Sequence, residues 1–297
     1  MKYANKLSWL GKAVLVLIVL TLALTTSTLS NAADDAKDYW VMLSDIHIPG
    51  EYDKELNGQV PNHHLAQIRD EILAGDTKPT GIFITGDVAF LQGEVNDYKT
   101  LAKQFDFFRE AGISVYPLMG NHDDYENFSV NAEKYAIKDT PVKGKQVVVV
   151  ETPNVNWFFL DSHINISTGA GMLGDEQLQW LAAELDKRAD KPAVLAAHHN
   201  LDESSGALQD QAKLWEIVKS HKQVKAYIYG HTHVYRESVR DDVHLINLPA
   251  IAWRFDEIQP LGWTEATIKP NGLELKLHTL DKNHPKNNDV RSFKWLR

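Results

Sequence analysis

Short apolar runs alternate along the chain with longer segments in which apolar residues recur at helical spacing. Runs of this length, bounded by polar residues or glycine, predict buried strands, and they cover residues 40–43, 81–85, 113–118, 193–197 and 224–229. Residues 147–150 and 157–160 form a further pair. Because Pro153 and Asn154 lie between them, we expect this pair to form a β-hairpin.

The segments between these runs predict helices, at residues 65–73, 98–108, 175–188 and 207–220. The last part of the chain, 243–278, is predicted to be rich in strands, and we expect a looser tail after Leu280. Strands that alternate with helices are typical of an α/β fold. No low-complexity linker interrupts the pattern, so residues 33–297 are expected to form a single domain.

The N-terminus has the three-part pattern of a secretory signal peptide. Three lysines without any acidic residue precede an almost purely apolar run at 13–24, and small residues follow up to Ala32. We therefore expect residues 1–32 to be a signal peptide and the protein to be exported, periplasmic or secreted, with no stable membrane insertion after cleavage. A retained anchor is the alternative, although a spanning helix needs about 20 apolar residues and this run is shorter.

Charge and cysteine content narrow the possible chemistry. The chain has 31 basic and 40 acidic residues, a formal net charge of −9, and no cysteine. Thiol catalysis and zinc–thiolate sites are therefore excluded. A net negative charge also disfavours binding of a nucleic-acid duplex through a broad basic surface. If the protein binds phosphate groups, the positive charge must come from a local source.

Polar side chains with metal-binding chemistry follow the predicted strands. They fall into five blocks: Asp45-Ile46-His47, Gly86-Asp87, Gly120-Asn121-His122-Asp123, His198-His199 and Gly230-His231-Thr232-His233. Ligands of α/β sheets gather at the carboxyl ends of strands, where these blocks lie. Residues two apart in an extended chain point to the same side, so Asp45 and His47 can reach one ion. Imidazoles combined with carboxylates suit Mn, Fe, Ni or Zn better than Ca or Mg.

The ordered set D-x-H, GD, GNHD, H, GHTH resembles the calcineurin-like metallophosphoesterases. This resemblance implies a double β-sheet sandwich flanked by helices (αββα), with two divalent or transition metal ions, Mn, Fe or Zn. By motif position, the first ion would be held by Asp45, His47, Asp87 and His233. The second would be held by Asp87, Asn121, His198 and His231. Asp87 would bridge the two ions. His122 would face the substrate, and Asp123 would orient it by accepting a hydrogen bond from its ring.

Two ions in one cleft imply a phosphoesterase that acts on a small phosphorylated substrate. Ions about 3.5–4 Å apart hold the attacking and leaving oxygens of an in-line displacement, and lower the pKa of a bridging water towards about 7. A hydroxide would then attack phosphorus. His122 would protonate the leaving group or stabilise the charge on the transferring phosphoryl group. The two ions would also supply the positive charge that the acidic surface lacks.

Smaller features favour one branch of the family. Phe90 stands where the purple acid phosphatases have a metal-ligating tyrosine, which argues against that branch. The stretches 160–162 and 171–181 look more like bacterial cyclic-nucleotide phosphodiesterases. We therefore expect a phosphodiesterase. A phosphomonoesterase or nucleotidase on the same scaffold and an inactive metal-binding scaffold are the alternatives. The oligomeric state stays open.

Other residues near these blocks have weaker signals. His199 follows the expected ligand His198, and strand alternation predicts that it points away from the metals in a structural role. Trp253, Arg254 and Trp263 come after the last metal block. They are candidates for the wall of a substrate pocket, with core packing as the alternative for the two tryptophans.

Overall fold

The computed structural model describes residues 38–166 and 168–297. The predicted signal peptide and its apolar run lie outside the described residues. Within them, no helix is both long enough and apolar enough to cross a membrane.

The first of two six-stranded sheets has the strand order β12-β11-β10-β1-β2-β3. Strands β1, β2 and β3 run parallel, whereas β10, β11 and β12 extend the sheet beyond β1 in antiparallel fashion. The strands are β1 (Asp38–Leu43), β2 (Gly81–Ile84), β3 (Ser114–Pro117), β10 (Gly262–Lys269), β11 (Gly272–Thr279) and β12 (Val290–Lys294). The parallel part therefore sends three successive carboxyl ends to one edge.

The second sheet has the strand order β4-β5-β6-β7-β9-β8. The expected hairpin is present as antiparallel β4 and β5, and β5, β6, β7 and β9 run parallel. The strands are β4 (Val148–Glu151), β5 (Asn156–Phe159), β6 (Ala193–Ala196), β7 (Val224–Tyr229), β8 (Arg236–Arg240) and β9 (Val243–Asn247).

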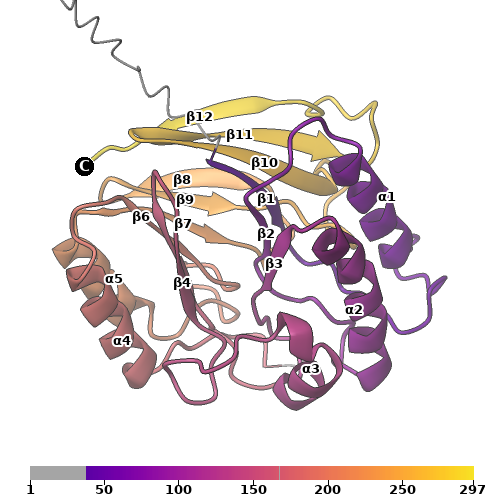
Figure 1. Cartoon of the computed structure of the whole chain (residues 1–297), viewed down its shortest axis with the longest axis horizontal. Helices are drawn as coiled ribbons and strands as arrows, with labels where there is room; N and C mark the ends of the chain where they lie inside the picture. Colours follow the sequence, from indigo (N-terminus) through magenta and orange to yellow (C-terminus); the bar gives the residue numbers. More distant parts are fainter. Residues whose placement is uncertain (1–37, 167) are drawn as a thin grey trace, which may run out of the picture. The chain divides into compact units, whose positions relative to one another are not determined.

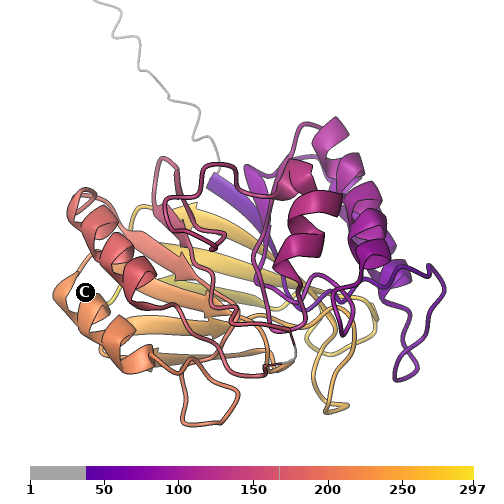
Figure 2. The ribbon, with the colours of Figure 1, turned by 90° about the horizontal axis from the view of Figure 1, so that it is seen from below.

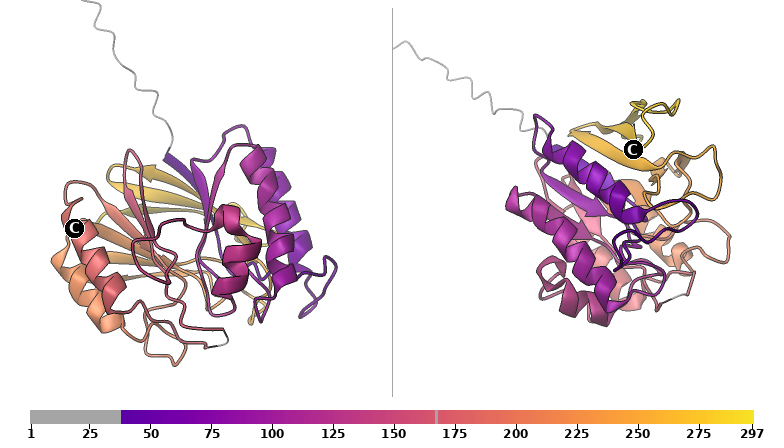
Figure 3. Two further views of the ribbon diagram at one scale, coloured as in Figure 1. Left: turned by 60° about the horizontal axis from the view of Figure 1, so that its bottom comes forward. Right: turned by 90° about the vertical axis from the view of Figure 1, so that its right-hand side faces the viewer.

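Helices cover the outer face of each sheet (Figure 1). One group packs beside β1–β3, and the other packs against the second sheet, as a view from below also shows (Figure 2). The first group is α1 (Pro61–Leu73), α2 (Val95–Glu110) and α3 (Tyr125–Asn131), and the second is α4 (Asp175–Asp186) and α5 (Gln211–Ser220). Figure 3 shows α1 and α2 side by side over the first sheet.

Alternating side chains of the buried strands divide the core into layers. On β1, Trp40 and Met42 pack between the sheets with Phe83, Trp157 and other buried residues of both sheets. Val41 and Leu43 point the other way, towards apolar residues of α1 and α2. A third cluster joins the second sheet to α4 and α5. A sheet buried on both faces needs apolar residues on both sides, and for this reason the sequences of the buried strands are continuously apolar rather than alternating. The αββα sandwich is confirmed.

The structure departs from the sequence expectations at several elements. The tail after Leu280 contains β12, which pairs with β11. Strand β8 was not expected either, because its residues are polar and mostly exposed. Helix α5 begins at Gln211, whereas a start at residue 207 was expected. Asp210 precedes the helix but does not cap it, because its side chain accepts hydrogen bonds from the backbone N–H groups of Leu173 and Gly174. The short helix α3 has only one buried residue, so its apolar periodicity is weak.

Candidate metal centre

The expected ligands come from loops that follow the parallel strands of both sheets. Backbone hydrogen bonds hold these loops together: the N–H groups of Asp45 and His47 donate to the carbonyls of Gly86 (3.2 Å) and Asp87 (2.9 Å). The two sheets are joined at the same place, since the N–H of His231 lies 3.1 Å from both carboxylate oxygens of Asp45. The blocks that are distant in sequence therefore meet at one edge.

Asp45, His47 and His233 form the first buried cluster, with one potential ligand atom of each within 4.8 Å of the others. His233 Nε2 lies 3.5 Å from Asp45 Oδ1. The other ring nitrogen of His233, Nδ1, lies 2.7 Å from the carbonyl oxygen of Trp253. Since that carbonyl can only accept, Nδ1 donates and Nε2 is left with its lone pair directed at the cluster.

The carboxylate of Asp87 lies between two histidines that belong to different clusters. Its Oδ2 atom is 3.6 Å from His47 Nε2 and 3.3 Å from His198 Nε2. Asp87 is 2% exposed, so its charge is removed from water and needs a partner within the protein. This is the position that a bridging ligand requires.

The second cluster lies around His198. Its Nε2 atom is 3.2 Å from Asn121 Oδ1 and 3.2 Å from His231 Nδ1. His198 Nδ1 lies 2.9 Å from the carbonyl oxygen of Thr85, which fixes the donor side of the ring in the same way as in His233. The structure thus brings together all of the side chains expected as ligands: Asp45, His47, Asp87, Asn121, His198, His231 and His233.

The donor set fits a pair of divalent transition metal ions. Both ring nitrogens of His47 are buried and lack a hydrogen-bond partner within the described residues, which is costly unless another group binds them. Four imidazoles, an amide oxygen and two carboxylates lie together, and this donor set suits Mn, Fe or Zn. Asp45, His47, Asp87 and His233 would hold one ion, and Asp87, Asn121, His198 and His231 the other.

Burial and neighbouring charges together set the protonation of these groups. Burial acts to lower the pKa of His198, but the charge of Asp87 outweighs burial and raises that pKa to about 9, so a metal ion must displace a proton from this ring. Burial lowers the pKa of His47 to about 3, and burial followed by the nearby His198 lowers that of His231 to about 4. Burial acts to raise the pKa of Asp87, but the charge of His198 and its hydrogen bond outweigh burial and hold that pKa well below its usual value. At neutral pH, two imidazoles are therefore neutral and the shared carboxylate is ionised.

Most of the expected ligands have left-handed backbone conformations. Positive φ angles occur at Asp45 (50°), His47 (41°), Asp87 (52°), His231 (68°) and His233 (55°). Non-glycine residues rarely adopt this region, and each such residue costs about 1–3 kcal/mol. Concentrated strain of this kind is typical of functional sites. Asp45 and His47 converge because the chain turns sharply after β1 ends at Leu43, rather than because an extended strand alternates.

Two of the glycines in the blocks are required by close approach. Gly86 has φ +109°, and a Cβ atom on it would lie 2.7 Å from His198 Nδ1. A Cβ atom on Gly120 would collide with Oδ1 and the backbone nitrogen of Asp87. Any side chain at these positions would therefore displace an expected ligand.

His122 lies at the rim of the first cluster. It is partly exposed, and its ring packs edge-on against His47 at a centroid distance of 5.3 Å. Its Nδ1 atom lies 2.8 Å from the carbonyl oxygen of Leu91, so Nδ1 is the donor and Nε2 is available to exchange a proton. Its backbone N–H also donates to Asp87 Oδ1 at 2.9 Å.

The expectation that Asp123 orients the His122 ring is wrong. The carbonyl of Leu91 takes that place, because the backbone between the two residues turns the Asp123 carboxylate towards the interior. There it accepts hydrogen bonds from the N–H groups of Gly120 (2.8 Å), Ala89 (2.9 Å) and Val88 (3.2 Å). Asp123 therefore fastens the loop after β3 to the loop after β2.

Replacing Asp123 with alanine is expected to lower the free energy of unfolding by about 3–5 kcal/mol, because three buried N–H groups lose their acceptor. The matched control is Asp124→Ala, which removes only the N-cap of α3, where Asp124 accepts from the N–H of Asn127 at 2.6 Å. That loss costs about 1 kcal/mol. Urea denaturation measures both variants. Equal losses in the two, or lost activity at full stability, would contradict this structural role.

His199 also differs from the sequence expectation. Its ring lies 4.7 Å from that of His231, centroid to centroid, and it belongs to a buried group with His198 and His231. Its Nδ1 atom is 2.7 Å from the Ser162 hydroxyl, and Nε2 has no partner among the described residues. His199 therefore lies beside the second cluster.

Two aromatic residues pack beside the first cluster, and their spacing in the sequence did not indicate this position. Trp253 packs on His47 at a centroid distance of 4.1 Å, and Phe255 packs on His233 at 4.8 Å. Trp253 is buried, with Phe90 and Ala252 as neighbours. It therefore forms the wall behind the expected ligands.

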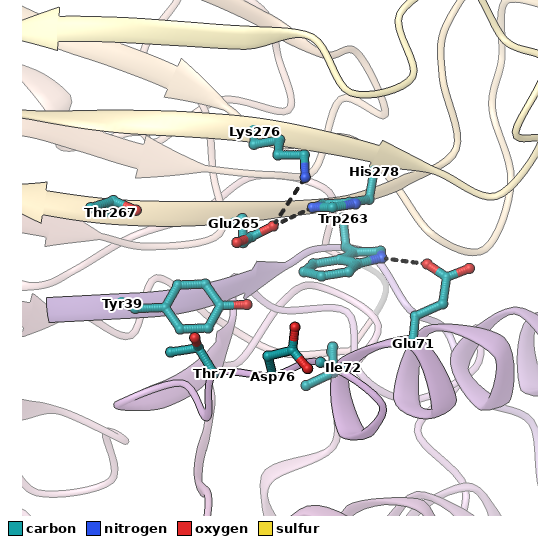
Figure 4. Close-up of a pocket in the computed structure, with 11 residues that line it drawn as sticks. Tyr39, Glu71, Ile72, Asp76, Thr77, Trp263, Glu265, Thr267, Lys276 and His278 are labelled. Carbon is teal, nitrogen blue, oxygen red and sulfur yellow. Dashed lines mark hydrogen bonds and ion pairs between the residues drawn. The ribbon is translucent and has the colours of Figure 1, made fainter. Parts of the chain in front are cut away.

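Trp263 does not line this site. It stacks on His278 at a centroid distance of 4.1 Å in a separate cavity of about 510 Å³ between α1 and strands β10 and β11 (Figure 4). Its Nε1 atom donates to Glu71 at 3.3 Å, and His278 Nε2 pairs with Glu265 at 2.5 Å. This cavity shares no residue with the metal clusters.

Comparisons with known proteins agree with this geometry. The family model described as calcineurin-like phosphoesterase matches residues 41–235. A protein of Ruthia magnifica named "probable cyclic nucleotide phosphodiesterase" is 24% identical over 240 residues, covering 78% of this chain and 94% of its own length. A cAMP/cGMP dual specificity phosphodiesterase of Mycobacterium tuberculosis is 29% identical over 212 residues, covering 68% of this chain and 64% of its own.

The fold has counterparts among solved structures. A dimetal phosphatase from Danio rerio superposes with a TM-score of 0.67 at 12% sequence identity, and the match covers 86% of this chain and 98% of that one. At this identity, the likeness concerns the arrangement of the two sheets and their helices.

Proposed function

This chain belongs to the calcineurin-like phosphoesterase family and is a metal-dependent phosphoric ester hydrolase. On that basis, we propose that it is an exported phosphodiesterase with two metal ions, and that it acts on small substrates such as 3′,5′-cyclic nucleotides. The observation that carries the proposal is the position of Asp87. One buried carboxylate oxygen lies between His47 and His198, which belong to two different clusters.

The protein's own residues have distinct parts in such a reaction. The seven clustered side chains would hold the ions, and backbone carbonyls fix the rings of two of them, His198 and His233. Ions bound there lower the pKa of water and neutralise charge on the phosphoryl oxygens. His122 is held by Leu91 with Nε2 available, which places a proton donor beside the first cluster. Asp123 keeps the His122 loop in place.

Two observations favour a diesterase over a monoesterase. The relatives described above are named phosphodiesterases. Moreover, the ion pairs of the seven expected ligands in the described part of the chain are all between histidine and aspartate, without Arg or Lys. A dianionic monoester would gain more from such a cation than a monoanionic diester. An inactive scaffold is disfavoured because every expected ligand is present.

A substrate panel tests this proposal. Purified protein loaded with Mn²⁺ is expected to hydrolyse bis(p-nitrophenyl) phosphate and cyclic AMP with higher kcat/KM than p-nitrophenyl phosphate and AMP. Protein treated with a chelator should lose this activity and regain it with Mn²⁺. Higher kcat/KM on the monoesters would support the nucleotidase alternative, and no hydrolysis at all would support the inactive scaffold.

Export is tested separately, because it rests on the sequence pattern of residues 1–32. Mass spectrometry of the protein recovered from an export-competent host should give a mature chain that begins near Ala33. An intact N-terminus in the membrane fraction would favour the anchor instead.

A further inference from the structure

Two exposed apolar side chains lie on the loop between β9 and β10, and one of them, Phe255, contacts the first metal cluster. Phe255 is 75% exposed and Ile258 is 72% exposed. The Phe255 ring nevertheless contacts His233, at a centroid distance of 4.8 Å and an interplanar angle of 33°. One face of this ring therefore covers an expected ligand, while most of its surface stays open to solvent.

The loop that carries them is firmly attached to the site. The N–H groups of Ile251 and Ala252 donate to the carbonyls of Ser44 (3.1 Å) and Asp45 (3.0 Å), and the carbonyl of Trp253 accepts from His233. Phe255 thus follows a segment that is bonded to two expected ligands.

The end of the loop is closed by its own contacts. The N–H of Gln259 donates to the carbonyl of Asp256 at 3.0 Å, and the Gln259 side chain accepts from the N–H of Tyr235 at 3.0 Å. Arg254 pairs with Glu257 at 2.7 Å. The positions of Phe255 and Ile258 are therefore set by the fold rather than by a loose loop.

Phe255 and His122 lie against different ligands of the first cluster. His122, the proposed proton donor to the leaving group, packs on His47, whereas Phe255 packs on His233. An acyclic phosphodiester bound at the cluster carries two organic groups, whereas in a 3′,5′-cyclic nucleotide both ester oxygens belong to one nucleoside, which stays on phosphorus after cleavage. If one group of an acyclic diester leaves beside His122, the surface at Phe255 is available to the other.

We propose that Phe255 contacts the organic group that stays on phosphorus and selects diesters in which this group carries a flat aromatic ring such as a nucleobase. This inference rests on the phosphodiesterase activity proposed above. Aromatic side chains bind every base through its π-face, whereas an alkyl group offers no comparable stacking surface. The preference should therefore appear in KM, because stacking is equally strong before and during the reaction.

Two substrates with the same leaving group test the proposal. Thymidine 5′-(p-nitrophenyl) phosphate retains a nucleoside on phosphorus, and methyl p-nitrophenyl phosphate retains only a methyl group. Phe255→Ala is expected to raise KM for the thymidine ester about tenfold, with KM for the methyl ester and both kcat values within about twofold. Phe255→Trp should restore the low KM. In calorimetry, Phe255→Ala should weaken binding of the product thymidine 5′-phosphate but not of methyl phosphate, and Phe255→Trp should leave both unchanged.

The matched control is Phe107→Ala, since Phe107 is a 48% exposed phenylalanine on α2 that packs on Arg69, and not on an expected ligand. It should change neither KM. Equal changes for the two esters, or none, in Phe255→Ala would overturn the proposal, as would a change of mass in light scattering that shows Phe255 in an interface between two copies. If the wild-type protein cleaves neither ester, the proposed function itself fails.

Discussion

Replacing Asp87 with asparagine is expected to lower kcat/KM on phosphodiesters by at least about a thousandfold. The carboxylate lies between His47 and His198, so one substitution removes a charged ligand from both ion positions. Ion-assisted stabilisation of a phosphoryl transition state is worth several kcal/mol, and each 1.36 kcal/mol is about tenfold in rate. Metal analysis of the same sample should show reduced content of both ions.

The control for this substitution is Asp76→Asn. Asp76 is an exposed carboxylate in the loop after α1, and it lines the separate cavity of Figure 4. Its loss should leave both rate and metal content at the wild-type level. An Asp87→Asn protein with two ions per chain and intact turnover would show that the carboxylate is not shared.

Replacing His122 with alanine is expected to lower kcat by about 10²–10⁴ on a diester with a poor alkoxide leaving group. Its Nε2 atom is available for proton transfer, because Nδ1 is bonded to the Leu91 carbonyl. The p-nitrophenolate leaving group needs little protonation, so the loss on an aryl ester should be smaller. Both kcat values and the metal content of the variant are measured together.

Three results separate the possible roles of His122. Unequal losses at full metal content agree with a proton donor. Equal losses on both esters would indicate a role that does not depend on the leaving group, and lost metal would identify His122 as a ligand. His63→Ala serves as control, since His63 is a surface residue that pairs with Asp53 at 2.7 Å.

The order of apolar runs was sufficient to predict an α/β fold, because buried strands and helices with one apolar face have distinct periods. The arrangement as a two-sheet sandwich was implied by the family resemblance. Strand β8 lacked the signal of a buried strand, since its exposed residues include Arg236 and Glu237. Strand β12 has a similar pattern, in which only Phe293 is buried. Edge strands of this kind are held by backbone pairing, which has no counterpart in side-chain pattern.

The sequence predicted which residues form the site better than it predicted their contacts. The seven expected ligands meet, but Asp45 and His47 do so through left-handed turns. The His122 ring donates to a backbone carbonyl. The N–H groups of Val88 and Ala89 donate to Asp123, which lies 35 and 34 residues further along the chain. Phe255 reaches His233 only through the β9–β10 loop. Contacts of these kinds depend on the folded path of the chain and leave no spacing in the sequence.

The central claim is a pair of ions that share Asp87, and anomalous X-ray diffraction from crystals of the Mn²⁺-loaded protein tests it most directly. The account predicts two anomalous peaks about 3.5–4 Å apart, with Asp87 in contact with both. One peak should lie within the cluster of Asp45, His47 and His233, and the other within that of Asn121, His198 and His231. A single peak, or two peaks that do not share Asp87, would contradict it.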